Sequence, residues 1–259
     1  MDKAILAVSF GTAYGETRKK TIEAIEKDLA AAFPERRLYA AWTSGKILRK
    51  LRARGEEAPL TLNEALEAME KDGIWDVLVQ PTFLQAGYEM RLVRETLEQW
   101  KGRFSRMALG SVLVAGQEDL EALARAMEES FSGLKEDEVL ALMGHGSEEG
   151  DFYPYVRLTE VFRRDGRENF CVGTVECEPG IEPVLALVSA RKPKKVVLAP
   201  LMIVAGDHAV NDMAGDEPDS WKNRIAALGT QAECLLRGLG EYPEVRKLFV
   251  AHARAAVLL

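Results

Sequence analysis

Short aliphatic runs alternate along this sequence with longer segments whose apolar residues recur every three or four positions. The short runs are typical of strands that are buried on both faces of a parallel sheet, and the longer segments have the period of amphipathic helices. This alternation predicts an α/β protein in which helices cover mainly parallel sheets. The expected strands are residues 4–9, 37–42, 76–80, 107–113, 139–143, 170–175, 195–199 and 232–236. The expected helices are residues 16–33, a segment that Thr61 and Glu64 open with the spacing of a capping box, and residues 89–101, 118–131, 154–164, 182–191, 220–228 and 244–257.

The expected strands fall into two sets, with a candidate boundary between them. Residues 133–137 combine a helix stop with a charged stretch directly before a new strand, and they divide the chain almost evenly. We therefore expect an N-terminal lobe of residues 1–134 and a C-terminal lobe of residues 135–259. The final expected helix, residues 244–257, could pack against the N-terminal lobe.

The two halves resemble each other in two separate blocks. Residues 77–89 (VLVQPTFLQAGYE) align with residues 196–208 (VVLAPLMIVAGDH). Residues 5–12 (ILAVSFGT) align with residues 140–147 (LALMGHGS). Because the blocks recur in the same order, we infer an internal duplication.

The duplication predicts two similar Rossmann-like lobes, each a doubly wound and mainly parallel sheet, that face a central cleft. The carboxyl ends of the strands should line this cleft, because ligands of open α/β sheets bind there. The alignment matches Phe10 with His145 and Glu89 with His208, so the C-terminal lobe would supply both imidazoles.

Histidine is scarce in this chain, which contains His145, His208 and His252. His145 lies between two glycines directly after an aliphatic strand, and His208 lies a few residues after another. A single histidine of this kind is equally compatible with a tight turn, but two neutral imidazoles at strand ends that line the mouth of a cleft could share a first-row divalent metal ion. His252 lies in the last helical segment without a motif around it, and we assign it no functional role.

Two glutamates extend this candidate set. Glu176 directly follows an expected strand, so it could add a carboxylate to the histidines or interact with the dipole of the next helix. Two histidines and a carboxylate suit Co2+, Fe2+, Ni2+ or Zn2+ and leave positions open for a second ligand. Glu89 could accept a proton or cap the helix that begins there. The acidic loop of residues 207–217 could attract a hydrated cation, although a solvated loop is the default interpretation.

Charge, cysteine content and motifs argue against several other classes of protein. The net charge of −7 provides no basic patch for nucleic acid. No apolar run is long enough to span a membrane, and residues 1–10 resemble a core strand rather than a signal peptide, so we expect a soluble cytoplasmic protein. Cys171, Cys177 and Cys234 are too few for a disulfide framework. The chain has neither a phosphate-binding loop nor a Gly-x-Ser-x-Gly elbow, which argues against nucleotide-driven and acyl-transfer chemistry.

Short motifs at strand ends can be read together along nearly the whole chain. They are Ser9-Phe10-Gly11-Thr12, Gln80-Pro81-Thr82, Gly87-Tyr88-Glu89, Gly144-His145-Gly146, Gly173-Thr174-Val175-Glu176 and Gly206-Asp207-His208. In this order and spacing they resemble the anaerobic sirohydrochlorin cobaltochelatases, a family of class II chelatases that inserts Co2+ into sirohydrochlorin during cobalamin synthesis. Cys177 and the Thr82-Phe83 pair depart from the small or polar residues expected in some members, which bears on the shape of the pocket.

The resemblance implies that Co2+ is a substrate, that a sirohydrochlorin-type tetrapyrrole is its acceptor, and that neither a nucleotide nor an organic cofactor is needed. It implies that His145, Glu176 and His208 contact the metal, and that Glu89 is placed like a residue implicated in activity. The residues expected to position the tetrapyrrole are Ser9, Phe10, Gly11 and Thr12.

A tetrapyrrole loses two pyrrole protons when it gains a divalent metal ion, so the reaction needs proton acceptors. Since imidazoles usually titrate near pH 6.5, our hypothesis is that His145 and His208 hold the ion and accept protons, with Glu89 assisting. One alternative is a ferrochelatase-type insertion of Fe2+ into sirohydrochlorin or a porphyrin. Another is a protein that binds metal or tetrapyrrole without catalysis. A homo-oligomer is compatible with all three.

Overall fold

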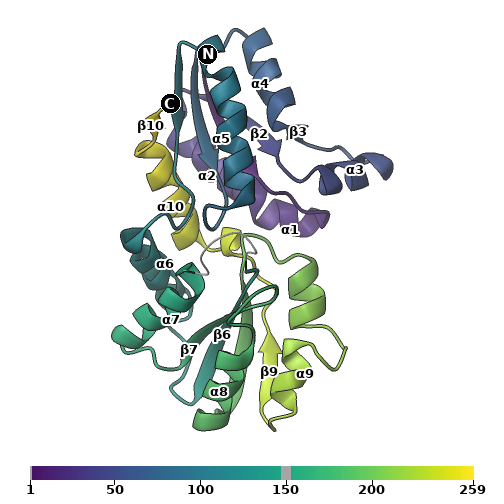
Figure 1. The fold of residues 1–259 in the computed structure, drawn as a ribbon, viewed down its shortest axis with the longest axis vertical. Coiled ribbons are helices and arrows are strands. Elements are labelled where there is room, and N and C mark those ends of the chain that lie inside the picture. The colour runs from purple at the N-terminus through teal and green to yellow at the C-terminus, as the bar shows by residue number, and fades with distance from the viewer. Residues whose placement is uncertain (1, 147–152) are drawn as a thin grey trace. The chain divides into compact units, whose positions relative to one another are not determined.

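Parallel strands form the centre of both parts of this chain in the computed structural model, which describes residues 2–146 and 153–259. Unit 1 consists of Met1–Ala115 and Pro243–Leu259, and unit 2 consists of Gly116–Tyr242. Each unit has its own sheet with helices packed against it (Figure 1). The predicted α/β class with two Rossmann-like lobes is confirmed.

Unit 1 alternates strands and helices and is completed by the end of the chain. Its elements are β1 (Lys3–Ser9), α1 (Gly15–Lys20), α2 (Ile22–Ala32), β2 (Arg37–Trp42), α3 (Gly45–Ala53), β3 (Leu60–Thr61), α4 (Leu62–Lys71), β4 (Asp76–Pro81), α5 (Tyr88–Trp100), the 3-10 turn η1 (Lys101–Arg103), β5 (Arg106–Leu109), α10 (Pro243–Arg254) and β10 (Val257–Leu258). The strand order is β10-β5-β4-β1-β2-β3. The neighbours are parallel except β10, which pairs antiparallel with β5, so the C-terminal segment (yellow in Figure 1) extends the sheet of unit 1.

Unit 2 repeats the same alternation on a smaller scale. Its elements are α6 (Gln117–Ser130), β6 (Glu138–Gly144), α7 (Tyr153–Arg164), β7 (Phe170–Thr174), α8 (Glu182–Arg191), β8 (Lys195–Leu201), the π-helix η2 (Ala209–Met213), α9 (Trp221–Ala226), β9 (Gln231–Cys234) and the 3-10 turn η3 (Leu239–Glu241). The strand order is β7-β6-β8-β9, and all these neighbours are parallel.

The strands are buried as their composition predicts. Residues 4–8 of β1 are fully buried, as are residues 139–141 of β6, because helices cover both faces of a parallel sheet. The helices bury one face each; α2 buries Ile22, Ile25 and Leu29, which recur at helical spacing. The predicted capping box at the start of α4 is present, since the Thr61 hydroxyl accepts from the Glu64 amide and the Glu64 carboxylate accepts from the Thr61 amide.

The sheets support the duplication inferred from the sequence. The order β2-β1-β4-β5 in unit 1 corresponds to β7-β6-β8-β9 in unit 2. The register also agrees, because Val8 lies opposite Pro81 in unit 1 and the aligned residues Met143 and Pro200 lie opposite each other in unit 2. Ser147, aligned with Thr12, lies outside the described residues.

Several expected boundaries differ from the structure. The strand expected at 107–113 ends at Leu109, and the helix expected at 244–257 ends at Arg254, before β10. The units divide at Ala115/Gly116 and again at Tyr242/Pro243, not at residues 134/135, because α6 packs against α7 and belongs to unit 2. The expected helix 16–33 is two helices, α1 and α2, which break at Thr21 (φ −114°, ψ −78°).

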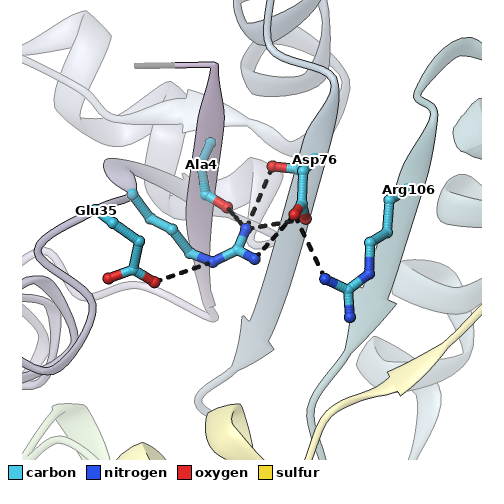
Figure 2. A network of polar contacts seen from close by, with 5 residues as sticks. Ala4, Glu35, Asp76 and Arg106 are labelled. Carbon is cyan, nitrogen blue, oxygen red and sulfur yellow. Dashed lines mark hydrogen bonds and ion pairs between the residues drawn. The ribbon is translucent and has the colours of Figure 1, made fainter.

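A partly buried ion network joins the amino ends of the central strands of unit 1 (Figure 2). Asp76, at the start of β4, accepts hydrogen bonds from Arg36 through both carboxylate oxygens, at 3.0 and 3.1 Å. Arg36 also donates to the carbonyl oxygen of Ala4 in β1, and Arg106 of β5 lies 3.5 Å from Asp76. The network connects three neighbouring strands at the edge opposite their carboxyl ends.

No helix within residues 2–146 and 153–259 has both the length and the apolar character that a membrane crossing requires.

Candidate metal site in unit 2

His145 stands on a turn that needs glycine on both sides. It directly follows β6 and its side chain is exposed. A Cβ on Gly144 would lie 2.3 Å from the ring of Tyr155, and Gly146 has φ +90°, a conformation that favours glycine. The Nδ1 atom of His145 is 3.0 Å from the carbonyl oxygen of Gly146. The Gly-His-Gly motif therefore specifies a close packing and a turn as well as an exposed imidazole.

Glu176 is tied to the same turn through the backbone. It lies two residues after β7, and its amide donates to the carbonyl oxygen of His145 at 2.9 Å. The preceding amide of Val175 donates to the carbonyl oxygen of Gly144 at 3.0 Å. These bonds continue the pairing of β6 and β7 beyond the strands and place the exposed Glu176 carboxylate beside His145.

His208 reaches the same place from β8. It directly precedes the π-helix η2 and is half-buried. Its Nε2 atom lies 3.6 Å from Oε1 of Glu176, and its Nδ1 atom lies 2.9 Å from Oδ2 of Asp212. The acidic loop, whose default interpretation was a solvated segment, thus contacts the site through Asp212.

Together these side chains form a compact set of donors. The rings of His145 and His208 are 4.8 Å apart and almost perpendicular. Their ligand atoms and one carboxylate oxygen of Glu176 all lie within 4.8 Å of one another. Two ligands on one first-row divalent ion are usually about 3 to 3.5 Å apart, given bonds of about 2.0–2.2 Å, so small side-chain adjustments would allow all three to bind one ion. The sequence expectation that these residues come together agrees with the geometry, because β6 lies between β7 and β8.

Glu89 lies in unit 1, in the first turn of α5, and is half-buried. Its Oε2 atom is buried without a hydrogen-bond partner among the described residues, and no side chain caps α5. A buried carboxylate oxygen without a donor is expensive to desolvate.

The residues expected to bind the tetrapyrrole differ in exposure. Phe10 presents 47% of its surface to solvent, whereas Ser9, Gly11 and Thr12 are buried. Ser9 shares a hydrogen bond of 2.8 Å with Thr82, and Gly11 (φ +105°) packs against the ring of Trp42. In unit 1, therefore, Phe10 offers a side chain for contact, and its three neighbours hold the turn that carries it.

The comparisons with known proteins identify the family of this chain and support its fold. The sequence matches the family described as "Cobalt chelatase (CbiK)" over residues 3–258, so the chain belongs to the cobalt chelatase family. It is 39% identical over 257 residues to a protein of Salmonella typhimurium named "Sirohydrochlorin cobaltochelatase", covering 99% of this chain and 97% of the relative. It is 30% identical to "Sirohydrochlorin cobaltochelatase CbiKC" of Nitratidesulfovibrio vulgaris, covering 98% and 90%.

Solved structures support the fold at lower sequence identity. "SirB from Bacillus subtilis with Fe3+" matches with a TM-score of 0.64 and 15% identity, covering 98% of this chain and 95% of that one. The structure of "CbiX, the terminal Enzyme for Biosynthesis of Siroheme in Denitrifying Bacteria" matches with a TM-score of 0.55 and 17% identity, covering 98% of this chain and 100% of that one. Both structures therefore share the fold of this chain.

Proposed function

We propose that this protein inserts Co2+ into sirohydrochlorin without ATP. The observation that carries the proposal is the set of His145, Glu176 and His208, whose donor atoms lie within 4.8 Å of one another in a member of the cobalt chelatase family. The relatives at 39% and 30% identity, each covered over most of its length, are both named as sirohydrochlorin cobaltochelatases.

In this proposal the donor set holds the metal as a substrate and then releases it to the macrocycle. Two imidazoles and one carboxylate bind a first-row divalent ion but leave coordination positions open for incoming pyrrole nitrogens. Because the set is exposed or half-buried, the ion can be exchanged. A small number of protein ligands favours release of the metal ion from such a site.

The two protons must be accepted by side chains that are free of the metal ion for at least part of the reaction. Each tetrapyrrole loses two N–H protons, and we assign Glu89 as one acceptor because its Oε2 is buried without a hydrogen-bond partner in the described part of the chain. Once the metal has left, Nε2 of His145 or His208 can accept the other proton. Phe10 is the candidate for stacking on the macrocycle, since its aromatic ring is exposed.

The metal and the acceptor are tested together in one anaerobic assay. Purified protein is offered Co2+, Fe2+ or Ni2+ with either sirohydrochlorin or protoporphyrin, and metallation is followed by the visible spectrum. We expect multiple turnovers fastest with Co2+ and sirohydrochlorin. Faster turnover with Fe2+ would favour the ferrochelatase-type alternative, and stoichiometric binding without turnover would favour a carrier.

Two further expectations accompany this proposal. The cytoplasmic location expected from the sequence stays a prediction, as does the capacity to form a homo-oligomer. The proposed reaction depends on neither the location nor the oligomeric state.

A further inference from the structure

The imidazoles of the metal site are each anchored through Nδ1. His145 Nδ1 lies 3.0 Å from the carbonyl oxygen of Gly146, and His208 Nδ1 lies 2.9 Å from a carboxylate oxygen of Asp212. Carbonyl and carboxylate oxygens accept hydrogen bonds, so in both cases Nδ1 is the nitrogen that carries the proton. The lone pair of each Nε2 is then available for a metal ion, and His208 Nε2 lies beside Glu176, 3.6 Å from Oε1.

The anchors differ in charge and in how they are built. The partner of His145 is a neutral backbone oxygen, whereas the partner of His208 is a side-chain carboxylate. A carboxylate behind a metal-binding histidine fixes the tautomer and the orientation of the ring, and it increases the basicity of the ligand nitrogen. With Glu176, Asp212 would also offset the double charge of a bound cation.

The local backbone explains why Asp212 reaches His208. The π-helix η2 follows His208 directly, and the amide of Ala214 donates to the carbonyl oxygen of Ala209, five residues earlier. Ala209 and Met213 are buried in the core of unit 2, which fixes the inner face of this turn. His208 and Asp212, each one residue before them, therefore lie on a shared face at its side. Single π-helical turns occur frequently at functional sites.

We propose that Asp212 is a positioning residue for the metal site, which holds Nε2 of His208 toward Glu176 and strengthens it as a ligand. This inference rests on the proposed function, because it assigns Asp212 a role in holding the substrate metal ion. Among the acidic residues of the loop, we assign this positioning role to Asp212. Asp216, for example, is fully exposed and pairs with Lys222 at 2.9 Å.

The test compares three variants with the wild-type protein. Asp212→Ala removes the hydrogen bond and the charge, and Asp212→Asn removes the charge while keeping an oxygen that can accept from Nδ1. Asp216→Asn removes one charge from the same loop without touching the site. The first readout is the dissociation constant of Co2+ alone, from anaerobic titration of its visible absorption bands. The second is the pair of KM values for Co2+ and sirohydrochlorin.

We expect Asp212→Ala to weaken Co2+ binding by about 10- to 100-fold, the usual effect of losing a carboxylate that supports a metal-binding histidine. Asp212→Asn should fall between Asp212→Ala and the wild type, and Asp216→Asn should bind like the wild type. KM for Co2+ should rise in both Asp212 variants while KM for sirohydrochlorin stays unchanged. If Asp212→Ala does not fold, the isosteric Asp212→Asn still gives the comparison.

The two proposals fail in different ways. Co2+ affinities of Asp212→Ala and Asp212→Asn within twofold of the wild type would overturn the role of Asp212, and so would an equal rise of both KM values. A wild-type protein that binds Co2+ tightly but never metallates sirohydrochlorin would contradict the proposed function. In that case a weaker Co2+ affinity in Asp212→Ala would still support the positioning role.

Discussion

Removing the carboxylate of Asp76 should destabilise unit 1 strongly. The Asp76 side chain is 2% exposed and that of its partner Arg36 is 10% exposed, so Asp76→Ala leaves an interior guanidinium with only the exposed carboxylate of Glu35, at 3.7 Å, as a counter-charge. Breaking a buried pair on one side usually costs about 3–5 kcal/mol. Arg36 keeps its bonds to the carbonyl oxygens of Ala4 and residue 76, so we expect the lower end, about 3 kcal/mol. The corresponding fall in Tm is roughly 10 °C for a unit of this size.

Urea unfolding followed by tryptophan fluorescence measures this loss of stability mainly in unit 1. Trp42, Trp75 and Trp100 lie in unit 1, whereas Trp221 lies in unit 2, so the signal is weighted toward the unit that contains Asp76. The midpoint should shift to lower urea concentration with little change in slope, because the surface exposed on unfolding is nearly the same.

A matched control is Asp72→Ala in the same unit. Asp72 pairs with Arg37 at 2.8 Å and accepts a hydrogen bond from the Tyr39 hydroxyl, but Asp72 and Arg37 are 38% and 58% exposed, and such exposed pairs contribute about 0–1 kcal/mol. Replacing both buried partners with apolar residues, Arg36→Met with Asp76→Leu, should recover much of the lost stability. If Asp76→Ala cost no more than Asp72→Ala, the reasoning about burial would be refuted.

Three further predictions concern the turn at His145, a half-buried acid and a buried thiol. Gly146→Ala should lower the unfolding free energy by about 1–2 kcal/mol, because φ is +90° there and an added Cβ would lie 3.1 Å from Cys177; unchanged urea stability would contradict this. Burial raises the pKa of Glu26 to about 7, so the folded state retains a proton that the unfolded state loses, and stability should fall as the pH rises from about 4.5 to about 7. Glu26→Gln should flatten this dependence in urea titrations at a series of pH values, and an equally steep wild-type and variant profile would count against it. Burial also raises the pKa of Cys171 to about 11, so iodoacetamide at pH 8 should modify it more slowly than the half-buried Cys177, as peptide mass spectrometry can measure; equal rates would show that Cys171 is accessible.

Much of the fold could be predicted because the repeated blocks carry both strand positions and register. The prolines Pro81 and Pro200, aligned in the sequence, pair with Val8 and Met143, which are aligned as well. The proximity of His145 and His208 could be predicted from the same pattern, since parallel strands bring their carboxyl ends to one edge and both histidines follow such ends.

Features that depend on packing between distant segments could not be predicted in this way. The charged stretch at residues 133–137 has the signs of a domain boundary, but α6 before it packs on α7 and shares its unit. The contact between Asp212 and His208 depends on a π-helical turn, for which the sequence gives no periodic signal. Arg36 lies in a short connection before β2, and only the folded chain places its guanidinium against Asp76.

The most direct test of the metal site is the initial rate of cobalt-sirohydrochlorin formation in single-histidine variants. His145→Ala and His208→Ala each remove one donor of the proposed set, while His252→Ala removes the remaining histidine, which lies on α10. After subtraction of the non-enzymatic rate, we predict a loss of more than about 100-fold in the first two, since even a supporting residue is usually worth about 10- to 100-fold. The His252→Ala protein should keep the wild-type rate. Wild-type rates in His145→Ala or His208→Ala would contradict the assignment of these imidazoles to the metal.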